Sequence, residues 1–142
     1  NVNNKSFNQN YTLTNIFTIK KKLELKAGLN ASFSKFESRI EQEFANWRPF
    51  GDIAWSVTDK ILLQSDFSYR IQNRDGVRIN EAKELNASVR YNAFKKTYIT
   101  FVAGNILGNN VIVNNSFNDN FIQTTTTDVL GRYFLVNLRY KF

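Results

Sequence analysis

The 142-residue sequence has no cysteine, no histidine and no methionine, and it has a single proline. Without cysteine, the chain can form no disulfide and offers no thiolate as a nucleophile or metal ligand. Without histidine, it lacks the commonest general base and the commonest metal ligand. Most hydrolytic, redox and zinc-dependent chemistries are therefore disfavoured. We expect a protein that is not an enzyme and that has no catalytic residue, no metal site and no cofactor.

Long apolar runs are missing as well. The sequence has no stretch of about 18 consecutive apolar residues, the least that a transmembrane helix needs, so such a helix is excluded. The length is that of one domain at most, and residues 1–142 are treated as one unit without an internal boundary. With 42% hydrophobic and 15% aromatic residues, the composition argues against a disordered chain.

The net charge is +7, but the basic residues gather between apolar segments, at Lys20–Lys22, Lys60 and Lys95–Lys96. These positions indicate turns. No basic stripe is interleaved with stacking aromatic residues, as nucleic-acid binding would favour, so we expect no nucleic-acid partner. Basic turns beside amphipathic strands fit an anionic surface such as lipid headgroups.

Hydrophobicity alternates with a period of two, which predicts β-strands. The seven predicted strands cover residues of about 11–19, 23–34, 47–58, 63–71, 84–92, 97–107 and 134–142. The sixth is apolar on both faces, so its orientation stays open. Pro49 is expected at the outer start of the third strand, where a missing ladder donor is tolerated.

The links between these strands alternate in length. Residues 20–22, 58–60 and 94–96 form short links, whereas 37–46, 73–79 and 108–129 form longer polar ones. Transmembrane barrels have short periplasmic turns and longer extracellular loops. The segments that these links leave between them, of roughly 10–14 residues, also suit a tilted bilayer crossing, which needs about 9–11. We therefore expect the short links in the periplasm and the long links outside.

The predicted fold is all-β: an antiparallel transmembrane β-barrel meander of about seven strands. A bacterial single-chain barrel has an even number of strands, from about 8 upward, so the seven are expected to be part of a larger barrel. Residues 1–9 are polar and not convincingly strand-like. They are expected on the extracellular side.

The two faces of the predicted strands differ in chemistry. One face is apolar, with aromatic residues near the strand ends, as in the aromatic girdles of membrane barrels. The other is polar and is expected to face a lumen, with charges at Glu24, Lys26, Asp66, Arg70, Glu84, Arg90, Arg139 and Lys141. These charges either mark a substrate path or, the interpretation we favour, pair across strands in a solvated lumen. The 108–129 loop could contact a ligand, although a solvated loop is favoured.

The sequence from Gly131 to Phe142 looks like the closing strand of outer-membrane β-barrels, with a terminal aromatic residue and an upstream glycine. Together with the stretches 85–91 and 103–109, it resembles the C-terminal part of Bacteroidota TonB-dependent receptors and related outer-membrane barrel families. The resemblance implies an integral outer-membrane location and contact with outer-membrane lipid. It also implies recognition by the barrel-assembly machinery through an assembly signal made of Gly131, Phe134, Val136, Leu138, Tyr140 and Phe142.

We therefore expect the chain to form the bilayer-spanning wall of an outer-membrane barrel of the TonB-dependent nutrient-uptake receptor type. The remaining strands of a larger barrel, or a partner protein, would complete it. The sequence shows neither a plug nor a TonB-contacting segment, so transport is not assigned to it alone. The alternatives are a non-transporting structural or assembly-complex barrel subunit and a soluble β-barrel carrier of an apolar ligand.

Overall fold

The computed structural model describes residues 5–37, 41–94, 96–108, 111–118, 121–128 and 130–141. All regular elements in these residues are strands, so the all-β prediction is confirmed. They are β1 (Lys5–Ile19), β2 (Leu23–Glu37), β3 (Glu41–Thr58), β4 (Ile61–Arg74), β5 (Val77–Phe94), β6 (Thr97–Gly104), β7 (Val111–Asn118), β8 (Phe121–Asp128) and β9 (Tyr133–Tyr140). The search of these residues for a helix long and apolar enough to cross a membrane found none.

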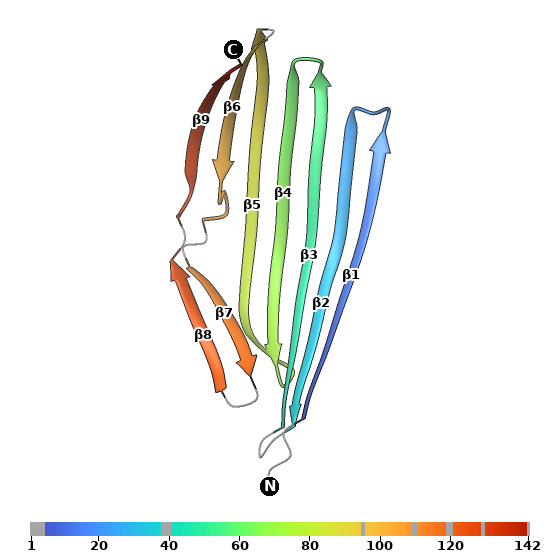
Figure 1. Cartoon of the computed structure of the whole chain (residues 1–142), viewed down its shortest axis with the longest axis vertical. Coiled ribbons are helices and arrows are strands. Elements are labelled where there is room, and N and C mark those ends of the chain that lie inside the picture. The colour runs from blue at the N-terminus through green and yellow to red at the C-terminus, as the bar shows by residue number, and fades with distance from the viewer. Residues whose placement is uncertain are drawn as a thin grey trace.

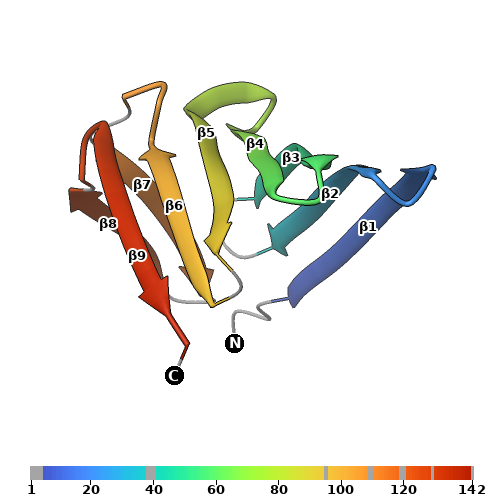
Figure 2. The same ribbon diagram turned by 90° about the horizontal axis from the view of Figure 1, so that it is seen from above.

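Seven strands form one antiparallel sheet in the order β1-β2-β3-β4-β5-β6-β9, and β7 pairs with β8 in a separate two-stranded sheet (Figure 1). Figure 2, which looks along the strands, shows that the large sheet is curved but open, with β1 and β9 at its free edges. The described residues therefore form the predicted seven-stranded antiparallel sheet but do not close it into a barrel.

The first five strands, β1 to β5, are longer than the sequence predicts, whereas β6 ends at Gly104, before the predicted end at residue 107. Residues 5–9 belong to β1, where Lys5 pairs with Glu37, so the prediction that they lie outside the strands is wrong. The predicted long links at 37–46 and 73–79 are also wrong, because only residues 38–40 separate β2 from β3 and only Asp75 and Gly76 separate β4 from β5. Asp75 and Gly76 both have positive φ, +50° and +78°, as a tight two-residue hairpin turn requires.

Pro49 lies in the middle of β3 rather than at its start. It pairs with Leu29 of β2, whereas the ladder to β4 runs from Trp47 directly to Phe50. The proline nitrogen cannot donate a hydrogen bond, which accounts for this gap. The missing donor is thus accommodated on the β4 side of a central strand.

The predicted 108–129 loop contains the β7–β8 hairpin, so the prediction of a loop without regular structure is wrong. β6 ends at Gly104 because Asn105 adopts a φ of +49°. The Asn105 backbone N–H donates to Asn86 Oδ1 at 2.8 Å, and its side chain donates to the Leu130 carbonyl at 2.9 Å. These hydrogen bonds hold the end of β6 against β5 and against the segment that precedes β9.

The described residues enclose almost no hydrophobic core. Ala31 and Phe44 are the buried hydrophobic residues among them, and no side chain is fully buried. A single curved sheet has no second layer to cover its apolar face, whereas soluble domains bury such a face against another layer. The fold is thus held mainly by ladder hydrogen bonds and by contacts between side chains of neighbouring strands.

Gly28 allows a close packing contact within this sheet. A Cβ atom at Gly28 would collide with the ring of its cross-strand neighbour Phe50 and would lie 2.5 Å from the Leu13 carbonyl oxygen of β1. The Leu13 oxygen is a backbone atom, so it cannot move aside without disturbing the ladder. The glycine is therefore required by the closeness of β1 and Phe50.

We expect Gly28→Ala to lower the free energy of unfolding by about 1–3 kcal/mol, the usual cost of overpacking. Gly51→Ala is the matched control, because a Cβ there would lie 3.6 Å from the Lys26 oxygen, an ordinary contact. Urea unfolding of the protein in detergent or lipid measures both variants. Equal effects of the two substitutions would contradict the proposed role of Gly28.

Candidate functional site: the two faces of the curved sheet

Cross-strand register assigns each side chain of the large sheet to one of two faces, because directly paired residues point to the same side. One row of paired residues is apolar across six strands: Leu23, Trp55, Leu63, Val89, Phe101 and Val136. This row resolves the sixth predicted strand, since Ile99 and Phe101 of β6 lie on the apolar face and Tyr98 and Val102 on the other. The alternation seen in the sequence is thus continuous across the sheet.

Two groups of aromatic residues bound the apolar face. The lower belt comprises Tyr11, Phe33, Trp47 and Tyr69, and the upper belt comprises Trp55, Tyr91 and Tyr140. In the lower belt, the Phe33 ring contacts Tyr11 and Trp47 edge-on, with centroid distances of 6.2 and 5.2 Å. Trp47 and Trp55 lie eight residues apart on β3, which corresponds to about 26 Å along a strand. Tyr11, Phe33 and Trp47 lie well inside their strands, not at the ends as predicted.

The apolar side chains between the two belts are exposed. Leu13, Phe101 and Val136 expose 63%, 52% and 68% of their surface. Ser65 is one of the few polar side chains there, and its hydroxyl donates to the Asn86 carbonyl at 2.9 Å. An exposed apolar surface that extends over a whole sheet far exceeds the patches usual on soluble monomers.

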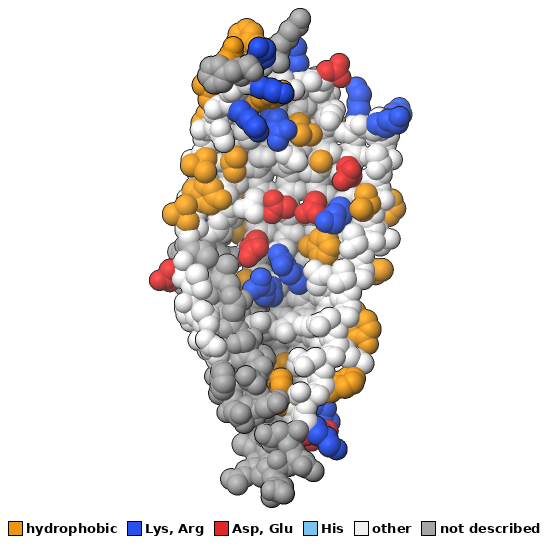
Figure 3. All heavy atoms as spheres, in the orientation of Figure 1, with side chains coloured by type: hydrophobic (Ala, Val, Ile, Leu, Met, Phe, Trp, Pro, Cys, Tyr) orange, Lys and Arg blue, Asp and Glu red, His pale blue; other side chains and the backbone are white. Residues whose placement is uncertain are grey.

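The opposite face is concave and polar. The register assigns seven of the eight predicted lumen charges to it, and the eighth, Lys141, lies one residue beyond β9 and lines a hollow together with Arg90 and Arg139. Figure 3 shows acidic and basic side chains gathered in the middle of this face. One row runs from Lys26 through Asp52 and Asp66 to Asn86. Lys26 Nζ lies 3.3 Å from Asp52 Oδ2, and Asn86 Nδ2 donates to Asp66 Oδ2 at 2.8 Å. Of the two carboxylates that face each other across β3 and β4, Asp52 is therefore paired with a cation, and Asp66 accepts a hydrogen bond from an amide.

A second network occupies the neighbouring rows of the polar face. The Arg48 guanidinium donates to the Ser68 hydroxyl at 3.4 Å and lies 3.9 Å from Glu84 Oε2. Ser68 in turn donates to Glu84 at 3.3 Å. Arg70 lies beside Arg48 in a hollow of about 370 Å³ that asparagine and threonine residues of β1 and β2 also line. In the middle of the face, Lys26 thus pairs with Asp52, and Arg48 with Glu84, across strands.

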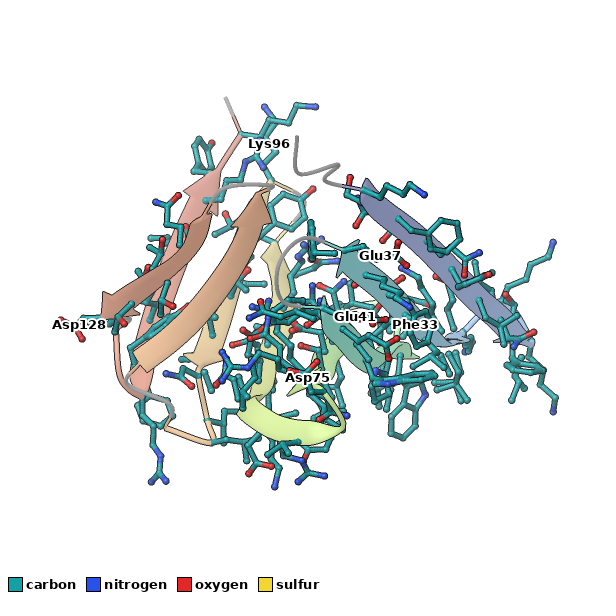
Figure 4. All side chains as sticks on the ribbon, turned by 90° about the horizontal axis from the view of Figure 1, so that it is seen from below. Phe33, Glu37, Glu41, Asp75, Lys96 and Asp128 are labelled. Atoms are coloured by element: carbon teal, nitrogen blue, oxygen red, sulfur yellow. The ribbon has the colours of Figure 1, made fainter. Side chains whose placement is uncertain are left out.

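Beyond the lower belt, at the ends of the β2–β3 and β4–β5 hairpins, several acidic residues surround Lys35. Lys35 Nζ is hydrogen-bonded to Glu41 and lies 3.5 Å from Glu37 and 3.7 Å from Glu43. The hydrogen bond to Glu41 is the main cause that raises the pKa of Lys35. Asp75 exchanges two hydrogen bonds with the Glu43 backbone, at 2.8 and 2.9 Å. Figure 4 shows Glu37, Glu41 and Asp75 near one another. These contacts explain why the ladder continues through residues that lack apolar alternation.

The opposite end of the concave face, beside the short turns, is basic. Arg90, Arg139 and Lys141 line a hollow of about 610 Å³ together with Tyr98, Thr100, Val102 and Asn137. The three basic residues were among the predicted lumen charges, but the other four were not singled out. Tyr98, Thr100, Val102 and Asn137 line this hollow because β6 pairs with both β5 and β9. The sequence pattern alone does not give this pairing.

The proposed assembly signal lies on an edge strand. Phe134, Val136 and Leu138 of β9 pair with Ala103, Phe101 and Ile99 of β6 on the apolar face, and Tyr140 pairs with Thr97. Gly131 precedes β9, and Phe142 lies outside the described residues. The other long edge of β9 has no strand partner among the described residues.

Metal ligation finds no support in the described residues, which contain no cluster of three or more acidic residues able to hold an ion. No family model, curated protein or solved structure matches this chain. Inferences about function therefore depend on the two faces of the sheet and on the chemistry that each presents.

Proposed function

We propose that the chain forms part of the bilayer-spanning wall of an outer-membrane β-barrel, with the convex apolar face toward lipid and the concave polar face toward a water-filled lumen. The observation that carries this proposal is the continuous apolar face between two aromatic belts, on a sheet without a core. Transmembrane barrels have an apolar outer band about 25 Å tall flanked by aromatic girdles. The spacing of Trp47 and Trp55 along a tilted β3 is compatible with such a band.

The direction of curvature favours this proposal over the soluble carrier. A carrier of an apolar ligand encloses apolar side chains on its concave face. In this sheet the concave face carries the ion pairs of Lys26 and Arg48, and the apolar residues are on the convex side (Figures 2 and 3). Lipid is the environment that can cover such a convex apolar face.

The free edges of β1 and β9 indicate which partners the wall needs. In hydrocarbon, each unsatisfied backbone group costs several kcal/mol, so both edges must be paired. The remaining strands of a larger barrel, or a partner protein, would supply this pairing, and the barrel-assembly machinery would insert β9. Because the closing-strand motif occurs together with the stretches 85–91 and 103–109, which resemble TonB-dependent receptors, we assign the wall to an uptake receptor of that type. In the alternative, a non-transporting barrel subunit, the concave face would need no solute-binding groups.

The native tryptophans provide a test in lipid vesicles. The variants Trp47→Phe and Trp55→Phe each leave one tryptophan in one aromatic belt. We expect bromine atoms near the lipid headgroups to quench either tryptophan more strongly than bromines deep in the acyl chains, because the belts would lie at the two membrane interfaces.

Two neighbouring positions on β2 provide the controls for this experiment. In the background without native tryptophan, Leu29→Trp on the apolar face should be quenched best by deep bromines. Asn30→Trp on the polar face should remain insensitive to brominated lipid and accessible to acrylamide. Equal lipid quenching at positions 29 and 30, or none at position 29, would exclude a lipid-facing wall.

A further inference from the structure

The basic hollow near the short turns has the shape of a trough, with a single strand as its floor and the two neighbouring strands as its walls. β6 forms its floor with Tyr98, Thr100 and Val102, whose side chains are shorter or less polar than those beside them. The two hydroxyl groups can donate hydrogen bonds upward from this floor. The floor therefore offers donors and no negative charge.

The walls of the trough come from the strands on either side of β6. Arg90 of β5 pairs with Thr100, and Thr100 pairs with Asn137 of β9, so the two walls are two strand spacings apart. Two spacings amount to about 10 Å. Arg139 follows Asn137 on the same face of β9, and Lys141 continues the wall. Long cationic side chains thus flank the floor on both sides.

The basic side chains of the trough lack the acidic partners that basic side chains have in the middle of the concave face. In the part of the chain that the structure describes, no side-chain hydrogen bond or ion pair engages Arg90, Arg139 or Lys141. In the middle of the same face, Lys26 and Arg48 both lie beside carboxylates. Figure 3 shows several basic side chains at the upper end of the face, whereas most of the acidic side chains lie in its middle.

We propose that this trough binds the phosphate group of an anionic solute. Guanidinium groups bind phosphate oxygens through short, charge-assisted and often bidentate hydrogen bonds. A dianion between the two walls would relieve the mutual repulsion of the three cations and accept hydrogen bonds from Tyr98 and Thr100. The site is open to water, so its affinity should be modest and should fall as ionic strength rises.

This site goes beyond the proposed wall function. Phosphate binding itself uses only the concave face, but the choice of a free solute rests on the proposed wall, in which the opposite face meets lipid. The phosphate could belong to a free solute or to a lipid headgroup that enters from the edge of β9. We assign it to a free solute, because the trough opens on the face opposite the apolar band.

Inorganic phosphate is the probe, and the full-length protein in detergent is titrated with it by calorimetry or equilibrium dialysis. The double variant Arg90→Gln/Arg139→Gln removes one cation from each wall. Lys21→Gln/Lys60→Gln is the matched control, because it removes the same charge from exposed turns at the same end of the sheet. We expect the first variant to bind phosphate at least about tenfold more weakly than the natural protein, and the control to bind within about twofold of it.

Two results would overturn the proposal. Equal loss of phosphate binding in the two double variants would mean that only net charge attracts the anion, and undetectable binding to the natural protein would mean that no site exists. A second comparison uses vesicles of phosphatidylglycerol and of phosphatidylcholine. If Arg90→Gln/Arg139→Gln weakens binding to the anionic vesicles but leaves soluble phosphate binding unchanged, the headgroup is the source and the solute assignment is wrong.

Discussion

Phe67→Arg is expected to lower the free energy of unfolding from lipid by about 2–4 kcal/mol, the cost of an arginine on the lipid face of a barrel near the bilayer centre. Phe67 lies midway between the two belts, because its paired neighbour Gly51 is equally far along β3 from Trp47 and Trp55, and its other paired neighbour is Leu85. An arginine there would hold a guanidinium against hydrocarbon. Equilibrium unfolding from lipid vesicles in urea or guanidinium measures the effect.

The matched control is Ser88→Arg, on the concave face of the neighbouring strand β5. Ser88 pairs with Gln64 and Val102 on the concave face, where water can solvate the new charge, so its effect should be mild. Ser68 is unsuitable as a control even though it shares this face, because it is only 8% exposed and is bonded to Arg48 and Glu84. A larger loss for Ser88→Arg than for Phe67→Arg would mean that the convex face does not meet lipid.

The alternation of side chains was sufficient to predict which residues share a face. Leu29 and Asn30, or Leu138 and Arg139, differ so clearly in polarity that a period of two assigns them without any structure. The extent of the strands was not predictable in this way. Around Lys35 and Glu41 the ladder is supported by ion pairs and by the Asp75 turn, and such cross-strand contacts leave no alternating apolar signal.

Cross-strand contacts on the concave face could not be predicted from the sequence either. Its charged residues were visible in the sequence because they interrupt apolar alternation. Their partners were not, since the pairing of Lys26 with Asp52 or of Arg48 with Glu84 depends on register. Asn105 was equally hidden, because its side chain connects segments 25 residues apart through a hydrogen bond to Leu130. Register is set by turns and by the buried side of each pair, which one sequence does not reveal.

Deleting Phe142, or replacing Tyr140 and Phe142 by serine, is expected to slow insertion of the protein in cells far more than it destabilises the finished barrel. β9 pairs with β6 on one side and has no strand partner on its other side among the described residues. An accessory machine can therefore capture it by adding a strand to that edge. The alternating residues from Phe134 to Tyr140 would present one apolar side to this machine, and Gly131 would allow a close backbone approach or a bend before the strand.

The competing explanation is that Tyr140 and Phe142 serve only in the interfacial aromatic belt. In that case the serine variants would lose stability and insertion rate in proportion. Tyr91 separates the two explanations, because it belongs to the same upper belt but lies on β5, an inner strand that is paired on both sides and offers no free edge. Pulse-chase insertion in cells, compared with urea unfolding of the purified barrel, should show that Tyr91→Ser affects stability and insertion alike. If the terminal variants behave as Tyr91→Ser does, the aromatic residues of β9 have no signalling role; unchanged insertion of the terminal variants would also exclude the assembly signal.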